Sequence, residues 1–330
     1  MRNDKLGDFM LAYPSFRLLK ERLPGAHVTA LVREYTREAA LMCPWIDEVL
    51  IVPDASSGTR PLIDALRAGR YDAVVTLFST TRVGYACWRA GIPYRLAPAS
   101  KLAQVFYNRR CVQRRSRSEK PEWAYNLDLA AELLRDHGLP AGTTPSGPYL
   151  SFPRAELAAL DERFRAAHGV AAGARIVMVH PGSGGSAVNL SLEQYARLLR
   201  ALSATSPLAF VISAGPGEGA RAEELARLLI GMHAVVHASE GSLTDFARHI
   251  AVADLFISGS TGPLHIAGAL DVHTAAFYPR RRSATALRWQ TLNSPERRLA
   301  FSPPESAEEH DMGAIDIAAA AAEISRRFLR

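Results

Sequence analysis

The chain has 330 residues, 48% hydrophobic and 22% charged, and a net charge of +6, which fits a globular protein of one large or two medium domains. It has no run of about 18 apolar residues and no apolar N-terminal stretch, so the sequence predicts neither a membrane span nor a signal peptide. The cysteines, Cys43, Cys87 and Cys111, follow no zinc or disulfide spacing, which indicates a reducing cytosol.

Short apolar runs alternate with helical patterns along the whole chain. In the first half we expect strands over residues 28–32, 49–52 and 73–78, and helices over residues 15–22, 62–68 and 123–137. In the second half we expect strands over residues 176–180, 208–214, 235–237, 255–258 and 274–278, and helices over residues 154–167, 192–203 and 220–229. This alternation predicts an α/β fold with parallel sheets covered by helices on both faces.

One segment interrupts the alternation. Residues 138–156 read GLPAGTTPSGPYLSFPRAE and are rich in Gly, Pro, Ser and Thr, which is typical of a linker. We therefore expect two doubly wound, Rossmann-like domains, over residues 1–148 and 149–312, with ligands at the carboxyl ends of the strands that line a cleft. A helix within residues 313–330 is expected to pack back on the N-terminal domain.

The first loop comes unusually early. Only four residues precede Lys5-Leu6-Gly7-Asp8, whereas a doubly wound domain normally opens with a strand that leads into such a loop. We expect either a very short first strand or, preferably, a chain that begins later than its natural start. Asp8 directly precedes the apolar residues Phe9 and Met10, so from this pattern it is either a helix N-cap or a carboxylate placed as a general base.

Two loops in the second half suit a nucleotide. The segment from His180 to Ser186, HPGSGGS, combines glycines with hydroxyl donors directly after an expected strand, which suits an anion or a sugar hydroxyl. It matches neither the Walker pattern nor the dinucleotide fingerprint. Glu218 follows the next strand, where a carboxylate either accepts hydrogen bonds from a ribose or only complements a helix dipole.

A phosphate-binding turn is expected between residues 259 and 263. An apolar strand leads into Gly259-Ser260-Thr261-Gly262, and Pro263 then opens a helix of small apolar residues. Backbone N–H groups at the mouth of such a helix bind phosphate. His265 lies one turn into this helix, and because no metal-binding pattern surrounds it, a packed, hydrogen-bonded histidine is favoured over a catalyst.

Basic residues crowd two short segments. The first contains Arg109, Arg110, Arg114, Arg115, Arg117 and Lys120, and the second contains Arg280, Arg281 and Arg282. Such clusters favour an acidic partner such as anionic lipid or a phosphorylated glycan, or they form a solvated loop without a partner. Nucleic acid is disfavoured because no nucleic-acid-binding motif accompanies the charge.

Taken together and in order, these segments resemble the heptosyltransferase-like glycosyltransferases of family 9, inverting enzymes with a GT-B fold. The matching segments are LGDFMLAYPSFRLLKERLPGAHVTALV, PEWAYNLDLAAELL, HPGSGGSAVNLSLEQYARLL, GPGE and SGSTGPLHIAGAL, which span nearly the whole chain.

The resemblance implies roles for the residues singled out above. Asp8 becomes the base that deprotonates the acceptor hydroxyl, a role that is compatible with capping a helix. The implied donor-binding residues are His180, Gly182, Ser183, Glu218, Ser260, Thr261, Gly262 and His265. The candidate acceptor-binding residues are Lys5, Arg114, Arg115 and Lys120. No metal and no cofactor are expected, since the nucleotide sugar is a substrate.

The chain departs from the family pattern at two positions. Val188, Asn189 and Leu190 stand where a Lys is expected, and Ser260 stands where an Asp is expected before the Thr-Gly pair. Both changes remove a charge from the donor site. Either the sugar differs from heptose or an Arg within residues 280–288 replaces the missing Lys.

We therefore expect a bacterial enzyme that moves a sugar, heptose in the first instance, from a donor such as ADP-heptose to a lipopolysaccharide core or a related surface glycan. The expected location is cytoplasmic, with peripheral contact to the inner membrane. Two alternatives stay open, a nucleotide-sugar epimerase of the same two-domain shape and a non-catalytic sugar-nucleotide binding protein. A dehydrogenase is disfavoured because GxGxxG is absent from the first turn.

Overall fold

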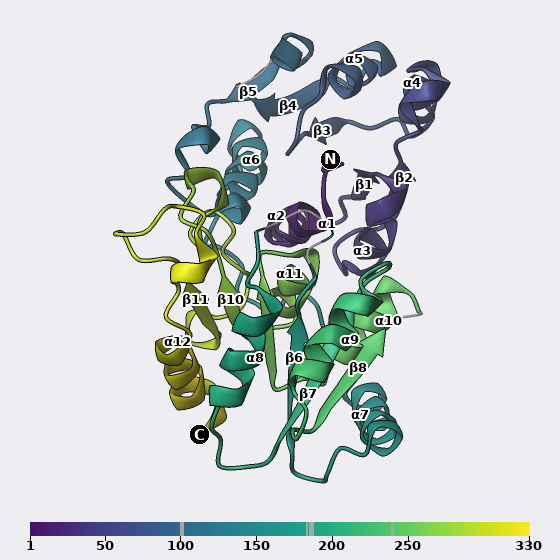
Figure 1. The fold of residues 1–330 in the computed structure, drawn as a ribbon. Helices are drawn as coiled ribbons and strands as arrows, with labels where there is room; N and C mark the ends of the chain where they lie inside the picture. Colours follow the sequence, from purple (N-terminus) through teal and green to yellow (C-terminus); the bar gives the residue numbers. More distant parts are fainter. Residues whose placement is uncertain (100–101, 183, 185–187, 239–240) are drawn as a thin grey trace. The chain divides into compact units, whose positions relative to one another are not determined.

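The computed structural model describes residues 1–99, 102–182, 184, 188–238 and 241–330, which form two compact units, Met1–Ser146 and Gly147–Arg330 (Figure 1). The division lies two residues before the boundary expected from the linker composition. Both units are built from parallel strands and helices, so the predicted α/β class is confirmed. No helix of the described residues is long and apolar enough to cross a membrane.

The first unit contains two separate parallel sheets. β1 (Thr29–Val32) pairs with β2 (Glu48–Ile51), while β4 (Tyr94–Pro98) lies between β3 (Ala73–Val75) and β5 (Arg109–Cys111). The surrounding helices are α1 (Leu6–Met10), α2 (Tyr13–Arg22), α3 (Arg37–Met42), α4 (Arg60–Ala68), α5 (Thr81–Ala90) and α6 (Glu122–Asp136), and the shorter turns η1 (Glu34–Thr36), η2 (Ala55–Ser57), η3 (Leu102–Phe106) and η4 (Arg115–Arg117).

The start of the chain forms no strand between these two sheets. Instead, the Met1 ammonium donates to the Val75 carbonyl at 2.6 Å, and the Leu77 amide donates to the Met1 carbonyl at 2.8 Å. Burial lowers the pKa of the Met1 ammonium to about 5. A cavity of about 630 Å³ is lined by residues of β1, β3, α2 and α6. Among the described residues of the first unit, the parallel strands therefore fall into two sheets rather than one.

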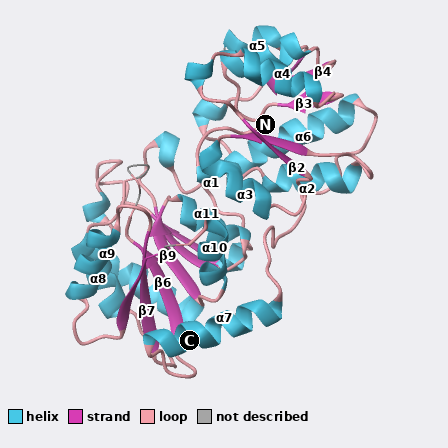
Figure 2. Ribbon diagram, turned by 90° about the vertical axis from the view of Figure 1, so that its right-hand side faces the viewer, coloured by secondary structure: helices cyan, strands magenta, loops and turns pink. Residues whose placement is uncertain are grey.

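The described residues of the second unit form one six-stranded parallel sheet. Its strands are β6 (Arg175–His180), β7 (Leu208–Ala214), β8 (Ala234–Ala238), β9 (Leu255–Gly259), β10 (His273–Phe277) and β11 (Arg298–Phe301), in the spatial order β11-β10-β9-β6-β7-β8. This is the strand order of a Rossmann sheet, with the switch point between β6 and β9. Helices cover both faces of the sheet (Figure 2).

The helices of the second unit begin at capping residues and pack against one another beside the sheet. Ser191 and Gln194 form a reciprocal capping box at the start of α8 (Leu192–Ala201), and Pro263 occupies the first turn of α11 (Gly262–Ala269). α8 contacts α9 (Gly219–Leu228), while α10 (Leu243–Ala251) contacts α7 (Arg154–His168) and α11. β6 and β9 are buried because helices cover both faces, as their continuous apolar runs predicted.

The expectation for the C-terminal helix is wrong. α12 (Ile317–Ile324) packs on α8 within the second unit and contacts the final π-turn η8 (Ser325–Leu329), and Ile324 and Leu329 are fully buried. Ile317, Ile324 and Phe328 belong to the same hydrophobic core as the strands β6 and β7. The apolar side chains of α12 thus complete the core of the unit that contains them.

Candidate active site

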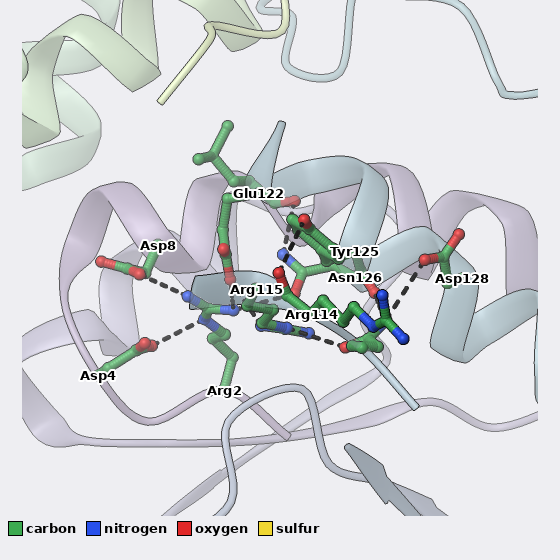
Figure 3. Close-up of polar contacts among 11 residues, drawn as sticks. Arg2, Asp4, Asp8, Arg114, Arg115, Glu122, Tyr125, Asn126 and Asp128 are labelled. Atoms are coloured by element: carbon green, nitrogen blue, oxygen red, sulfur yellow. Dashed lines mark hydrogen bonds and ion pairs between the residues drawn. The ribbon is translucent and has the colours of Figure 1, made fainter. Parts of the chain in front are cut away.

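A buried arginine organises the acidic residues at the start of the first unit (Figure 3). Arg2 is 2% exposed and contacts the carboxylates of Asp4, Asp8 and Glu122 and the amide oxygen of Asn126. The distances are 2.9 Å from Nε to Asp4, and 2.9 Å from Nη1 to both Glu122 and Asn126. Burial alone would lower the pKa of Arg2, but Asp4, Asp8 and Glu122 together raise it above its usual value. Arg2 is therefore a fixed cation that joins the chain start to α6.

Asp8 lies inside the first turn of α1, three residues after Lys5, which is the N-cap residue. Of the two interpretations of Asp8, the N-cap is therefore wrong, because its carboxylate pairs with Arg2 instead. Burial, with smaller increases from Asp4 and Glu122, outweighs the effect of Arg2 and raises the pKa of Asp8 to about 6. A carboxylate with this pKa is ionised at neutral pH and is a stronger base than an exposed aspartate.

The predicted acceptor-binding residues have different environments in the structure. Arg115 donates to Glu122 at 2.6 Å and thus joins the Arg2 cluster, which the sequence spacing could not show. Lys120 pairs with Asp128, whereas Lys5 and Arg114 are exposed and form no ion pair with any described residue. A hollow of about 360 Å³ is lined by Arg114, Lys120, Tyr125 and Asp128 among others.

In the second unit, the predicted donor loops leave neighbouring strands of the sheet. His180 at the end of β6 pairs in register with Ser258 of β9, so the loops after these strands begin side by side at the switch point. Gly215 follows β7, the neighbour of β6 on its other side. The arrangement brings His180, Gly182, Glu218, Ser260 and Thr261 to one edge, where doubly wound sheets bind ligands. Ser183 lies outside the described residues.

Glu218 holds two of these loops together. Its carboxylate accepts hydrogen bonds from the Gly184 amide at 2.9 Å and the Gly215 amide at 3.1 Å. A Cβ atom on Gly182 would lie 2.2 Å from this carboxylate, so the close approach requires glycine. The acidic side chain is therefore partly engaged by the protein itself, with acceptor capacity left on both oxygens.

His180 lies beneath this carboxylate and is 4% exposed. Its Nε2 atom is 3.5 Å from Glu218, and its Nδ1 atom is 3.1 Å from the Ser213 hydroxyl. Burial lowers the pKa of His180, while Glu218 and Ser213 oppose the effect. The ring is thus neutral at pH 7 and lies against the Glu218 carboxylate.

The N-terminus of α11 presents uncapped backbone amides. Thr261 is the N-cap residue, but its hydroxyl lies 2.9 Å from the Ser258 hydroxyl and makes no capping bond within the described part of the chain. The amides of Gly262 and Leu264 are therefore available to an anion, while Pro263 between them has no N–H. Ser260 is half-buried beside them.

His265 is 3% exposed and its Nδ1 atom has no hydrogen-bond partner among the described residues. Burial lowers its pKa to about 4, so the ring is neutral at pH 7. The expected packed position is confirmed, whereas the expected hydrogen bond at Nδ1 is missing from the described residues.

Two further residues connect the loops, and sequence reasoning assigned neither of these roles. Asn189 donates to the Pro181 carbonyl at 3.0 Å and accepts from the Tyr195 hydroxyl at 2.6 Å. Arg221, in the first turn of α9, donates to the same Pro181 carbonyl at 3.1 Å. A cation at a helix N-terminus is electrostatically unfavourable, and this was the signal in the sequence that could have singled out Arg221.

Arg280, in contrast, donates to the carbonyl of Ala307 at 2.7 Å. The expectation that an Arg within residues 280–288 replaces the missing Lys has no support from this contact. Arg221 is a cation that contacts the described part of the loop after β6.

Comparison with known proteins agrees with the geometry. Residues 59–295 match the model of glycosyltransferase family 9 (heptosyltransferase). A Haemophilus influenzae protein named "Putative glycosyltransferase" is 43% identical over 328 residues, which cover 98% of this chain and 94% of the relative.

Two solved structures share the fold at 18% identity. The match to Escherichia coli ADP-heptose lipopolysaccharide heptosyltransferase II has a TM-score of 0.77 and covers 98% of this chain and 96% of that chain. The family 9 glycosyltransferase of Veillonella parvula has a TM-score of 0.75, with 91% of this chain and 84% of that chain covered. The parallel-sheet units, the family match and the related sequence together show that this chain belongs to glycosyltransferase family 9 and is a glycosyltransferase of the GT-B fold.

Proposed function

We propose that this glycosyltransferase moves heptose from ADP-heptose to an anionic bacterial surface glycan, with lipopolysaccharide core as the first candidate, and that it inverts the anomeric configuration. The observation that carries the proposal is the position of Asp8, a carboxylate of raised pKa on the first helix of the first unit. Support for the nucleotide comes from the fold relative Escherichia coli heptosyltransferase WaaC, whose structure contains ADP.

In the proposed reaction, Asp8 removes the proton of the acceptor hydroxyl as its oxygen attacks the anomeric carbon. The new C–O bond forms on the face opposite the diphosphate, while the bond to the diphosphate oxygen breaks. Asp8 ends protonated and ADP leaves with an additional negative charge. Arg2 and Glu122 hold Asp8 in place, because all three belong to one buried cluster.

The second unit is proposed to hold the leaving group. The amides of Gly262 and Leu264 and the dipole of α11 stabilise negative charge on the diphosphate. Arg221 supplies a positive charge at the loop after β6, in place of the Lys expected there. No metal is required in this scheme, so a chelator such as EDTA is expected to leave the rate unchanged.

The acceptor is proposed to bind the first unit through its basic residues. Arg114 and Lys120 line the same hollow, beside the aromatic ring of Tyr125. These groups suit phosphate or carboxylate substituents on a glycan. Arg115 contributes indirectly, because its pairing with Glu122 fixes the segment that carries Arg114.

A ligand screen tests the donor assignment. Binding to the folded state raises the melting temperature, so ADP and ADP-heptose are expected to stabilise the protein more than UDP, GDP or their sugars. A larger shift with another nucleotide would contradict ADP-heptose. A larger shift with another ADP-sugar than with ADP-heptose would fit the loss of charge at Ser260. That result would change the proposed sugar but keep ADP as the nucleotide.

Asp8→Asn tests the base. This variant keeps the size of the side chain but cannot accept the proton, so transfer is expected to fall by at least about 100-fold while ADP binding is retained. Asp4→Asn is the matched control when assayed above pH 7, where Asp8 is ionised in both proteins, because Asp4 pairs with the same Arg2 and has the same 15% exposure. Retained turnover in Asp8→Asn would remove Asp8 as the base.

A further inference from the structure

The positive charge of the protein comes from one segment of the first unit. Between Asp72 and Glu119 the chain has no acidic residue but nine basic ones. They are Arg82, Arg89, Arg95, Lys101, Arg109, Arg110, Arg114, Arg115 and Arg117. The rest of the chain is slightly acidic, since the whole protein has 39 basic and 33 acidic residues. The segment therefore accounts for the entire excess.

Within this segment, the turn η3 packs directly on the helix α5. A Cβ atom on Gly84 would lie 3.0 Å from the ring of Tyr107, 3.2 Å from the ring of Phe106 and 3.3 Å from the carbonyl of Ala103. The Phe106 ring also contacts Tyr85 at 5.7 Å and Trp88 at 6.1 Å between ring centroids. One side of η3, formed by Ala103 and Phe106, thus covers the small-residue face of α5.

The other side of η3 is apolar and faces solvent. Leu102 and Val105 are three residues apart, so they share one side of this 3₁₀ turn, and they are 87% and 72% exposed. Tyr85 and Trp88 occupy the adjacent surface of α5 and are also exposed. We call these four residues the α5–η3 patch. Of the eleven exposed large hydrophobic side chains among the described residues, four lie in it.

Arginines border the α5–η3 patch. The guanidinium of Arg89 lies 5.8 Å from the centre of the Trp88 ring, in the geometry of a cation–π contact. Arg109 and Arg110 follow η3 on β5 and are exposed. Arg109 contacts Asp136 at 3.3 Å, whereas no ion pair joins Arg110 to any described side chain. Figure 1 shows α5 and β5 at the same end of the first unit.

We propose that the α5–η3 patch is a docking surface for an anionic lipid bilayer. Leu102 and Val105 enter the boundary between headgroups and acyl chains, while Tyr85 and Trp88 lie at headgroup level, where aromatic side chains are stable. The arginines of the segment attract anionic headgroups, and no carboxylate of the segment opposes them. This surface involves neither Asp8 nor the loops of the second unit.

Charge argues for lipid over a second copy of the chain. A symmetric dimer would bring the same patch of two molecules together and set their arginines against one another. An anionic bilayer has the opposite charge and accepts isolated apolar side chains without a shaped pocket. The proposal therefore commits to a lipid surface.

Vesicle co-sedimentation of the full chain, without substrates, tests the proposal. The wild-type protein is expected to bind vesicles of phosphatidylglycerol, to bind phosphatidylcholine vesicles at least about tenfold more weakly, and to be released by high salt. The double variant Leu102→Ser/Val105→Ser is expected to lose affinity for phosphatidylglycerol vesicles by a factor of about ten or more. Ile230→Ser is the matched control, because Ile230 is 78% exposed in the second unit, and it should bind like wild type.

A second pair of measurements separates lipid binding from other outcomes. The variant Arg89→Gln/Arg110→Gln is expected to bind phosphatidylglycerol vesicles more weakly and with a smaller dependence on salt. Vesicles should also shift the fluorescence of the wild-type protein to shorter wavelength, and this shift should be absent in Trp88→Phe. Equal binding by wild type and the Leu102→Ser/Val105→Ser variant would overturn the proposal. So would a dimer in solution that this variant dissociates. Neither result bears on the donor or on Asp8, since no substrate is present.

Discussion

The Asp4→Asn variant tests whether the buried arginine cluster sets the basicity of Asp8. Asp4 and Asp8 contact the same guanidinium, and the negative charge of Asp4 raises the pKa of Asp8. As an order of magnitude, two unit charges at a separation of about 6 Å repel by about 3 kcal/mol at an effective dielectric constant of about 20, which equals about two pH units. Each side chain is 15% exposed, so solvent screening reduces the expected shift to about one pH unit.

The assay is the pH dependence of kcat/KM for sugar transfer. In the wild type, the rate is expected to rise as the pH passes about 6, because the proposed base Asp8 must be ionised to accept the proton. Asp4→Asn lowers the pKa of Asp8, so its acidic limb should move to about pH 5. Asp161→Asn is the control, because Asp161 pairs with Arg165 in the second unit rather than with Arg2. An unchanged limb, or one that moves to higher pH, would refute this reasoning.

Three further predictions follow from the second unit. Gly182→Ala is expected to weaken ADP binding about tenfold or more, measured by calorimetry, because its Cβ atom would displace the Glu218 carboxylate. Gly219→Ala is the control and should bind ADP normally, because position 219 faces open space. Equal affinities of the two variants would contradict the proposed role of Glu218. The buried His265 stays neutral in the folded state down to about pH 4, whereas in the unfolded chain it takes up a proton below about 6.5. The free energy of unfolding is therefore expected to fall by up to about 3 kcal/mol as the pH falls from about 6.5 to 4. His265→Leu should reduce this pH dependence in urea titrations. Ile324→Ala should lower the free energy of unfolding by about 2–4 kcal/mol, whereas the exposed Ile230→Ala should not; a neutral Ile324→Ala would contradict packing of α12 in this core.

Strong hydrophobic periodicity made most of the fold predictable. The strands of the second unit from β6 to β10 were expected within one residue at each end, because fully buried parallel strands are continuous apolar runs. β4, β5 and β11 were missed because each contains an arginine, Arg95, Arg109 and Arg298 respectively. β5 and β11 also lie at the edges of their sheets. The placement of the C-terminal helix was wrong because a helical pattern shows which face is apolar but not which core it joins.

The candidate site was predictable where one strand leads directly into one loop. His180, Glu218 and Thr261 follow three neighbouring strands, so the parallel topology alone brings them to one edge of the sheet. The Arg2 cluster was not predictable, because it joins Arg2 to Glu122 across 120 positions of sequence. Arg221 was missed for a related reason, since only the folded loop shows that its guanidinium reaches Pro181.

The central claim is inverting transfer of heptose from ADP-heptose to a glycan acceptor. The most direct measurement is ADP release together with product structure, for wild type and Asp8→Asn, in the presence and absence of a heptose-acceptor glycolipid. We expect ADP release only with acceptor, a new glycosidic bond of inverted anomeric configuration, and almost no product from Asp8→Asn. An altered or free sugar without acceptor would indicate an epimerase, binding without turnover would indicate a non-catalytic protein, and retained configuration would contradict the mechanism.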